Sequence, residues 1–153
     1  MEKTSLIRTW LNIGLAAKLL QTAAQLFVWL ITGCRDMSRL VLLPLISTAV
    51  YIFVYCWLRA RTKQDPEPAS IGKTLVIGAA VPFCCTLALR EIDYILRWYV
   101  WNNVYNAEQL NLLDISKKYQ NGAGFLNIAA MIAFAAAAGM LCQRSQSAET
   151  QDT

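Results

Sequence analysis

Four apolar runs fill most of this 153-residue chain, and they restrict the folds that it can adopt. They extend over roughly Trp10–Thr32, Leu40–Leu58, Lys73–Leu89 and Ala123–Cys142. A helix rises ~1.5 Å per residue, so about 20 apolar residues cross a hydrocarbon core ~30 Å thick. The runs therefore predict an all-α membrane protein with four transmembrane helices. We expect a single transmembrane domain over residues 1–142 and a polar, mobile tail over residues 143–153.

The composition agrees with a protein that lies largely in a membrane. Charged residues make up 16% of the chain, against ~25% in an ordinary globular domain. Lys18, Gln21 and Gln25 interrupt the first run, so it does not resemble the short apolar core of a cleaved signal peptide. We expect the first helix to stay in the mature protein.

The residue types disfavour several kinds of chemistry. Histidine, the commonest transition-metal ligand and general base, is absent from the sequence. The five cysteines lie in or beside the apolar runs, without the C-x-x-C spacing of zinc sites and redox motifs. The 14 basic residues are scattered along the chain rather than clustered as in a nucleic-acid-binding surface. The sequence therefore predicts no metal, no cofactor and no nucleic-acid partner.

Tryptophan and the basic residues predict how the helices are oriented. Tryptophan prefers the headgroup level. Trp10 and Trp29 bracket the first helix, Trp57 ends the second, and Trp98 and Trp101 follow the third. With four spans, both termini share a side with the loop between the second and third helices. This side carries seven basic residues against six on the other. Because Arg59, Arg61 and Lys63 directly follow a span, we predict cytoplasmic termini in a bacterial cytoplasmic membrane.

The segment between the third and fourth runs is predicted to be a helical excursion along the membrane interface. Its apolar positions recur at helical spacing, as Ile92, Ile95, Leu96, Tyr99 and Val100. Residues 90–104 therefore either continue the third helix beyond the bilayer or lie in the interface. A second short helix is expected over Ala107–Tyr119, with Asn121-Gly122 as its stop signal. Within the third run, Pro82 predicts a kink.

Lys18 is the candidate site residue that most constrains the interior. It lies about 12 Å along the helix from Trp10, near the middle of the membrane, where a lysine costs ~2.5–3.5 kcal/mol. Polar residues share its side of the helix, and a matching stripe runs along the second helix. The predicted polar seam between the two helices consists of Lys18, Gln21, Gln25, Thr48, Tyr51 and Tyr55.

This seam has three interpretations. Amide, phenol and ammonium groups that hydrogen-bond across the interface would hold the two helices together. Alternatively, the same side chains would line a water-filled path or a ligand pocket. In the third interpretation, Lys18 extends toward the headgroups on its own.

Two further groups of residues are candidates for contact with partners. The first is a charged outer rim made of Arg90, Glu91, Asp93 and Arg97, which either anchors the outer end of the third helix or surrounds a pore mouth or docking surface. The second is a ridge of small residues on the fourth helix, made of Ala129, Ala133 and Ala137. Small residues let helix backbones approach closely, so the ridge packs either within the chain or against another membrane helix.

The function that these observations favour is a non-enzymatic one. We expect a component of a membrane complex, contacting the lipid bilayer and either a second copy of itself or another membrane protein as an accessory or scaffold subunit. The alternative is an oligomeric channel or small transporter, whose path the seam would line. A membrane enzyme is the least favoured class, because histidine and paired intramembrane carboxylates are missing.

Overall fold

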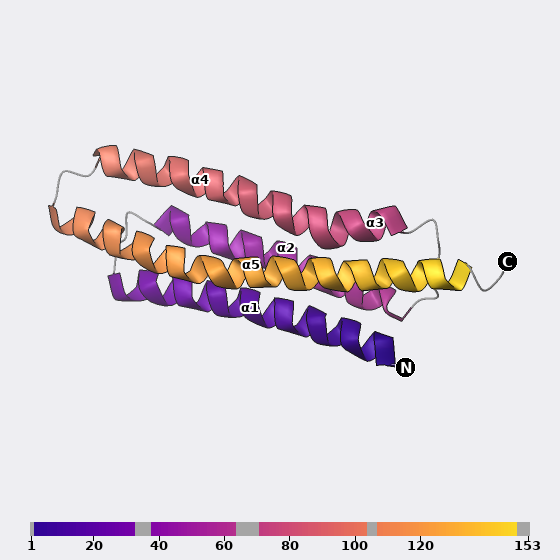
Figure 1. The fold of residues 1–153 in the computed structure, drawn as a ribbon. Helices are drawn as coiled ribbons and strands as arrows, with labels where there is room; N and C mark the ends of the chain where they lie inside the picture. The colour runs from indigo at the N-terminus through magenta and orange to yellow at the C-terminus, as the bar shows by residue number, and fades with distance from the viewer. Residues whose placement is uncertain (1, 33–37, 64–70, 104–106, 150–153) are drawn as a thin grey trace.

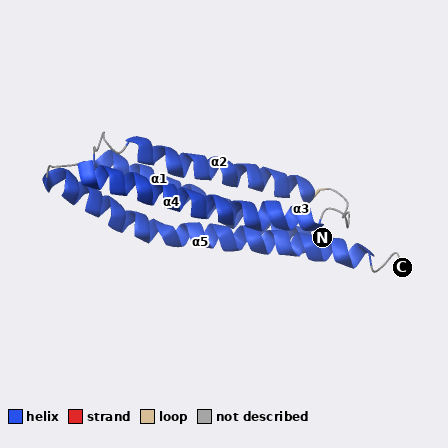
Figure 2. Ribbon diagram, turned by 90° about the horizontal axis from the view of Figure 1, so that it is seen from above, coloured by secondary structure: helices blue, strands red, loops and turns tan. Residues whose placement is uncertain are grey.

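The protein is an elongated, antiparallel bundle of helices. The computed structural model describes residues 2–32, 38–63, 71–103 and 107–149. Its elements are α1 (Glu2–Thr32), α2 (Ser38–Arg61), α3 (Ile71–Leu75), the π-helical turn η3 (Val76–Ala80), α4 (Val81–Asn103) and α5 (Ala107–Glu149). Figure 1 shows that both termini lie at the same end of the bundle. Seen from above in Figure 2, the helices run lengthwise beside one another.

Four of the described helical segments are long and apolar enough to cross a membrane, which confirms the four predicted apolar helices. They are Thr4–Val28, Leu42–Arg61, Ile71–Leu96 and Gly122–Ser147. The third segment joins α3, η3 and the first part of α4 into one continuous rod. Their bounds differ from the predicted runs, since the first segment begins and ends earlier and the second begins and ends later, whereas the third and fourth extend beyond their runs at both ends.

α1 packs along α5 more extensively than any other pair of described elements. The two helices approach closely at Gly14, where an added Cβ would lie 2.8 Å from the Phe134 ring and 3.2 Å from the Ala133 Cβ. A second close approach joins η3 to α5, because a Cβ on Gly78 would lie 2.6 Å from the Ala138 Cβ. Small residues at these points let the backbones meet.

The interior is a mixture of apolar and polar side chains, whereas much of the outside is apolar. Tyr51, Phe134 and Leu58 are buried in the apolar core. Buried polar side chains lie among them. Large apolar side chains are exposed on every long helix, including Leu20, Phe27, Phe53, Phe83, Phe125 and Ile132. This surface is typical of helices that contact lipid, and it exceeds the small apolar patches of soluble monomers.

Pro82 does not end the third long helix, which forms a wider, π-helical turn just before it. Proline lacks the N–H that would bond to the carbonyl four residues earlier, and its ring crowds that carbonyl. In this chain, the preceding turn is π-helical over Val76–Ala80, with the N–H of Val81 donating to the carbonyl of Val76. The extra residue in this turn accommodates the proline ring, so the helix continues into α4.

The excursion between the third and fourth runs is helical, but its predicted boundaries need correction. α4 continues the third apolar helix to Asn103, and α5 is one uninterrupted helix of 43 residues. The predicted stop at Asn121-Gly122 is wrong, since α5 passes through it. Residues 143–149, predicted to belong to a mobile tail, form the last turns of α5. The predicted start of the second short helix at Ala107 is where the described part of α5 begins.

Candidate functional site

The ammonium group of Lys18 lies at the centre of the bundle. Its side chain is only 1% exposed. Nζ donates hydrogen bonds to Oε1 of Gln21 at 2.7 Å and to Oδ1 of Asn127 at 2.8 Å, and it lies 4.8 Å from the ring centroid of Tyr51. Two amide dipoles and the negative face of an aromatic ring thus stabilise the charge.

Asn127 extends this arrangement to all four of the long apolar helices. Its Nδ2 donates to Oγ1 of Thr86 on α4 at 3.2 Å, and the Thr86 hydroxyl also shares a hydrogen bond of 3.2 Å with the Tyr51 hydroxyl. The Tyr51 ring packs edge-on against Phe134 of α5, with centroids 5.4 Å apart. The group of Lys18, Gln21, Tyr51, Thr86 and Asn127, hereafter the polar centre, therefore connects α1, α2, α4 and α5 through side-chain contacts.

The predicted seam between α1 and α2 is divided in the structure. Gln21 and Tyr51 join Lys18 in the polar centre. Thr48 is hydrogen-bonded to Thr22 across the α1–α2 interface, and its hydroxyl also contacts the carbonyl of Pro44. Gln25 is half-buried, and its Oε1 is buried with no hydrogen-bond partner among the described residues.

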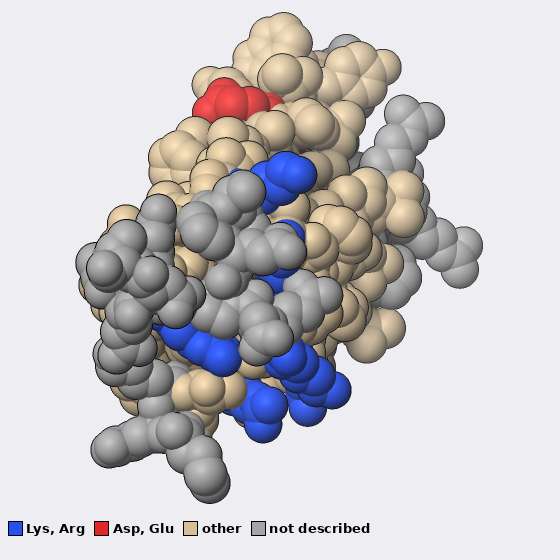
Figure 3. All heavy atoms as spheres, turned by 90° about the vertical axis from the view of Figure 1, so that its right-hand side faces the viewer, with Lys and Arg blue, Asp and Glu red and all other residues tan. Residues whose placement is uncertain are grey.

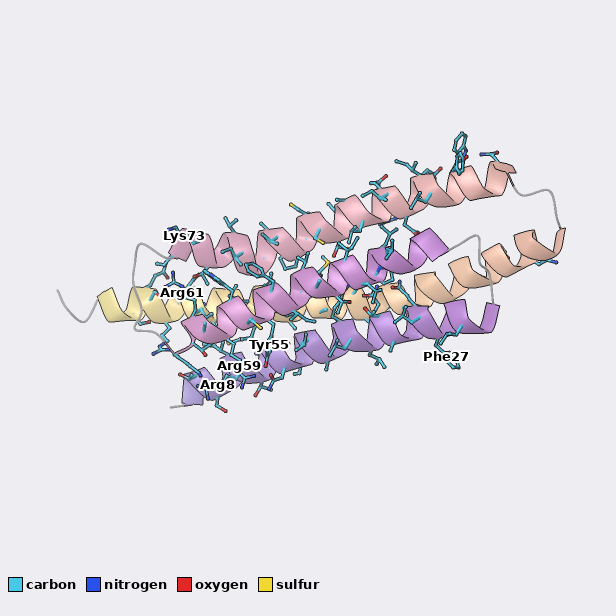
Figure 4. All side chains as sticks on the ribbon, turned by 180° about the vertical axis from the view of Figure 1, so that it is seen from behind. Arg8, Phe27, Tyr55, Arg59, Arg61 and Lys73 are labelled. Atoms are coloured by element: carbon cyan, nitrogen blue, oxygen red, sulfur yellow. The ribbon has the colours of Figure 1, made fainter. Side chains whose placement is uncertain are left out.

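Tyr55 belongs to a separate group near the end of the bundle that carries the termini (Figure 4). Its hydroxyl donates to Oδ1 of Asn12 at 2.9 Å and accepts a hydrogen bond from Arg59, whose guanidinium also lies over the Tyr55 ring. Tyr55 is one turn beyond Tyr51 on α2, so it shares the predicted helix face but lies at another depth.

The sequence missed Thr86 and Asn127 as members of the site. Asn127 is a lone amide in an otherwise alanine-rich apolar run, and polar residues inside such runs usually face the bundle interior. This was the available signal. Thr86 gave none, because a threonine hydroxyl in a helix bonds readily to its own backbone.

The predicted outer rim lies on the part of α4 away from the termini. Arg90 and Glu91 are exposed, and Asp93 is half-buried. The side chain of Arg97 lies outside the described part of the structure. Exposed aromatic side chains accompany these charges on α4, namely Tyr94, Trp98 and Tyr99.

The predicted ridge on the fourth helix packs mainly within the chain. Ala133 and Ala137 are buried, with Ala133 beside Gly14 of α1, whereas Ala129 is exposed. Two other small residues of α5 face outward, since Ala135 is exposed and nothing lies within 4 Å of a Cβ built on Gly139. A surface for another membrane helix is therefore available on the Ala135 side.

The hydrogen-bonding partners of the polar centre lie within the bundle. Its ammonium, amide and hydroxyl groups are hydrogen-bonded to one another, and this arrangement restrains the helices it connects. Among the described residues there is no group of three or more His, Cys, Asp or Glu side chains placed to hold a metal ion. In comparisons with protein-family models, curated proteins and solved structures, no match to this chain was found.

Proposed function

We propose that this chain is a membrane-embedded, non-enzymatic bundle that acts through lateral contacts, as an oligomerising, accessory or scaffold subunit of a membrane complex. The observation that carries the proposal is the burial of Lys18 among Gln21, Asn127 and Tyr51. The polar groups of the spans are thereby directed inward, where they hold the helices together. The outward surface is left to lipid and to other membrane helices.

The α5 surface on the Ala135 side supports lateral contact. Ile132 and Ala135 are exposed, and Gly139 has open space where a Cβ would lie. These residues follow one another at spacings of three and four, so they form one stripe along the helix. In lipid, small residues on such a stripe favour helix association by close van der Waals contact.

The distribution of basic residues supports cytoplasmic termini. Lysine and arginine side chains gather at the end of the bundle that carries both termini (Figure 3). They come from all four spans, as Arg8, Arg59, Arg61, Lys73 and Arg144, joined by Lys63 after α2. Basic residues next to spans are enriched on the cytoplasmic side. The bacterial cytoplasmic membrane is the location that we propose.

This orientation predicts which positions react with a membrane-impermeant maleimide. In a variant whose native cysteines are serine, Asn111→Cys should be labelled in intact cells, because Asn111 is exposed on the part of α5 that extends beyond the apolar span. Ser147→Cys should be labelled only after permeabilisation. Labelling of Ser147→Cys in intact cells would reverse the proposed orientation.

The function proposal predicts opposite outcomes for the same substitution at two positions of α5. Ala135→Leu should leave the chain folded but lower the mass of its complex in native-membrane nanodiscs, because the added side chain separates the paired helices. Ala133→Leu should unfold the chain instead, at a cost of about 3 kcal/mol or more, since Ala133 is 1% exposed beside Gly14. Circular dichroism and complex mass separate the two effects. An unchanged complex in Ala135→Leu would move the lateral contact to another helix.

A channel or small transporter is the second candidate. Gln25 favours it, because its buried Oε1 has no hydrogen-bond partner among the described residues and lies one turn from Gln21. Buried polar atoms of this kind are often hydrogen-bonded to water, and a short water chain at the polar centre would follow. Ion flux in proteoliposomes distinguishes the candidates: selective flux that Gln25→Leu abolishes would favour the channel.

A further inference from the structure

The register between α1 and α2 places two arginines across from each other. Three contacts define this register, since Thr22 bonds to Thr48, Lys18 lies over Tyr51, and Tyr55 bonds to Asn12. In this antiparallel pair, one helical turn beyond the Asn12–Tyr55 bond is Arg8 on α1 and Arg59 on α2. Figure 4 shows both side chains at the end of the bundle that carries the termini.

Arg59 is held in place while most of its donors are left available. One terminal nitrogen donates to the Tyr55 hydroxyl, and the guanidinium carbon lies 5.6 Å from the Tyr55 ring centroid. Asn12 in turn accepts the hydrogen bond of the Tyr55 hydroxyl at 2.9 Å. A guanidinium has five N–H donors, so this fixed group still has donors for an anion. Arg8 is exposed beside it.

The charge of this arginine pair is not balanced by the carboxylates that the structure describes. Those are Glu91, Asp93 and Asp114, which lie on the parts of α4 and α5 away from the termini. Two facing guanidinium groups favour an anion between them, and a phosphate accepts such bidentate hydrogen bonds well.

In a chain that spans a membrane, neighbouring tryptophans would place this pair near the depth of the lipid headgroups. Trp10 and Trp57 are partly buried and lie two residues from Arg8 and Arg59 in the sequence, and the Arg61 guanidinium lies 5.3 Å from the Trp57 ring centroid. Tryptophan with neighbouring basic residues is typical of the membrane–water interface. An anion bound here would therefore be at the level where phospholipids carry their phosphates.

We propose that Arg8, Asn12, Tyr55 and Arg59 form a binding site for the phosphate of an anionic phospholipid headgroup. This site rests on the proposal that the bundle spans a membrane. Arg59, aligned by Tyr55 and Asn12, donates to the phosphate from α2, and Arg8 donates from α1. Bound lipid thereby joins the two helices at their cytoplasmic ends.

Three single substitutions that each remove one positive charge test the site. Phosphatidylglycerol is titrated into the detergent-solubilised full chain, and binding is followed by the rise in thermal unfolding temperature. Arg8→Gln and Arg59→Gln should each weaken apparent binding about fivefold, which corresponds to ~1 kcal/mol per basic contact. Lys73→Gln removes the same charge from α3, away from this pair, and should change binding less than about twofold. Phosphatidylcholine should give a much smaller shift.

Several outcomes would overturn the lipid site. Equal losses in Arg8→Gln and Lys73→Gln would mean a diffuse attraction of anions to the basic end. An equal shift with inorganic phosphate at the same concentration would mean that the site takes a free anion. Arg8→Gln is the decisive variant, because Arg59→Gln also removes the Tyr55 contact and could disturb folding. Alkaline extraction of cell membranes tests the spanning proposal separately. If the chain stays in the membrane but Arg8→Gln does not weaken lipid binding, only the lipid-site proposal is rejected.

Discussion

Asn127→Leu is expected to lower the free energy of unfolding by about 2–3 kcal/mol, measured by reversible unfolding in mixed micelles. The substitution removes the Oδ1 atom that accepts from the Lys18 ammonium and the Nδ2 group that donates to Thr86. A buried charge then keeps only the Gln21 oxygen and the Tyr51 ring. A charge left with fewer partners costs more than an average hydrogen bond between membrane helices.

Two further variants isolate the effect of the charge. Lys18→Met together with Asn127→Leu should recover most of the lost stability, because the cation that required the amide is gone. Asn111→Leu, at an exposed position of the same helix, should change stability by less than about 0.5 kcal/mol. If Asn127→Leu were as stable as the native chain, water rather than the bundle would be solvating Lys18.

Gly78→Ala is expected to destabilise the bundle by about 2 kcal/mol. The new Cβ would lie 2.6 Å from the Ala138 Cβ and 3.3 Å from both Cδ atoms of Leu58. The Ala138 Cβ moves only with the α5 backbone, so overpacking of ~3 kcal/mol exceeds the ~1 kcal/mol that alanine adds as a better helix former. The free energy of unfolding in mixed micelles measures the difference.

The matched control lies on α3, just before η3, and the rescue lies on α5. Gly72→Ala meets nothing within 4 Å and should be neutral or slightly stabilising. Ala138→Gly in the Gly78→Ala background should restore much of the loss, since it returns the missing space to α5. A Gly78→Ala protein with native stability would show that the third rod shifts away from α5 without cost.

The number of long apolar helices was predictable because run length and hydrophobicity are local properties of the sequence. The boundaries were not, because they depend on competition between weak local signals. Asn121-Gly122 has the composition of a helix stop, but one glycine costs only ~1 kcal/mol in a helix interior. The residues on both sides continue α5, and this outweighs the cost. Residues 143–149 are polar, but a polar composition does not by itself end a helix, so α5 continues through them.

The polar centre was only partly predictable. The depth of Lys18 indicates burial, and helical spacing relates it to Gln21 and Tyr51. The participation of Asn127 depends on the packing of α5 beside α1, a contact between residues 109 positions apart. No periodicity within one helix determines such a contact. Tyr55 was grouped with Lys18 in the prediction but lies away from it, because residues that share a helix face need not share a depth.

Because α5 is long, a small tilt at the polar centre becomes a large movement at the Ala107 end of the helix. Asn127 attaches α5 to Lys18, and the helix extends from there to Ala107, about 30 Å away. If α5 tilts by about 10° around Asn127, its Ala107 end moves by about 5 Å, so the first half of the helix is a lever arm. A hydrogen bond tolerates a change of only a few tenths of an ångström. A tilt around Asn127 keeps the Lys18–Asn127 bond within that tolerance, so this bond sets where α5 lies at the polar centre without setting the angle of its Ala107 half.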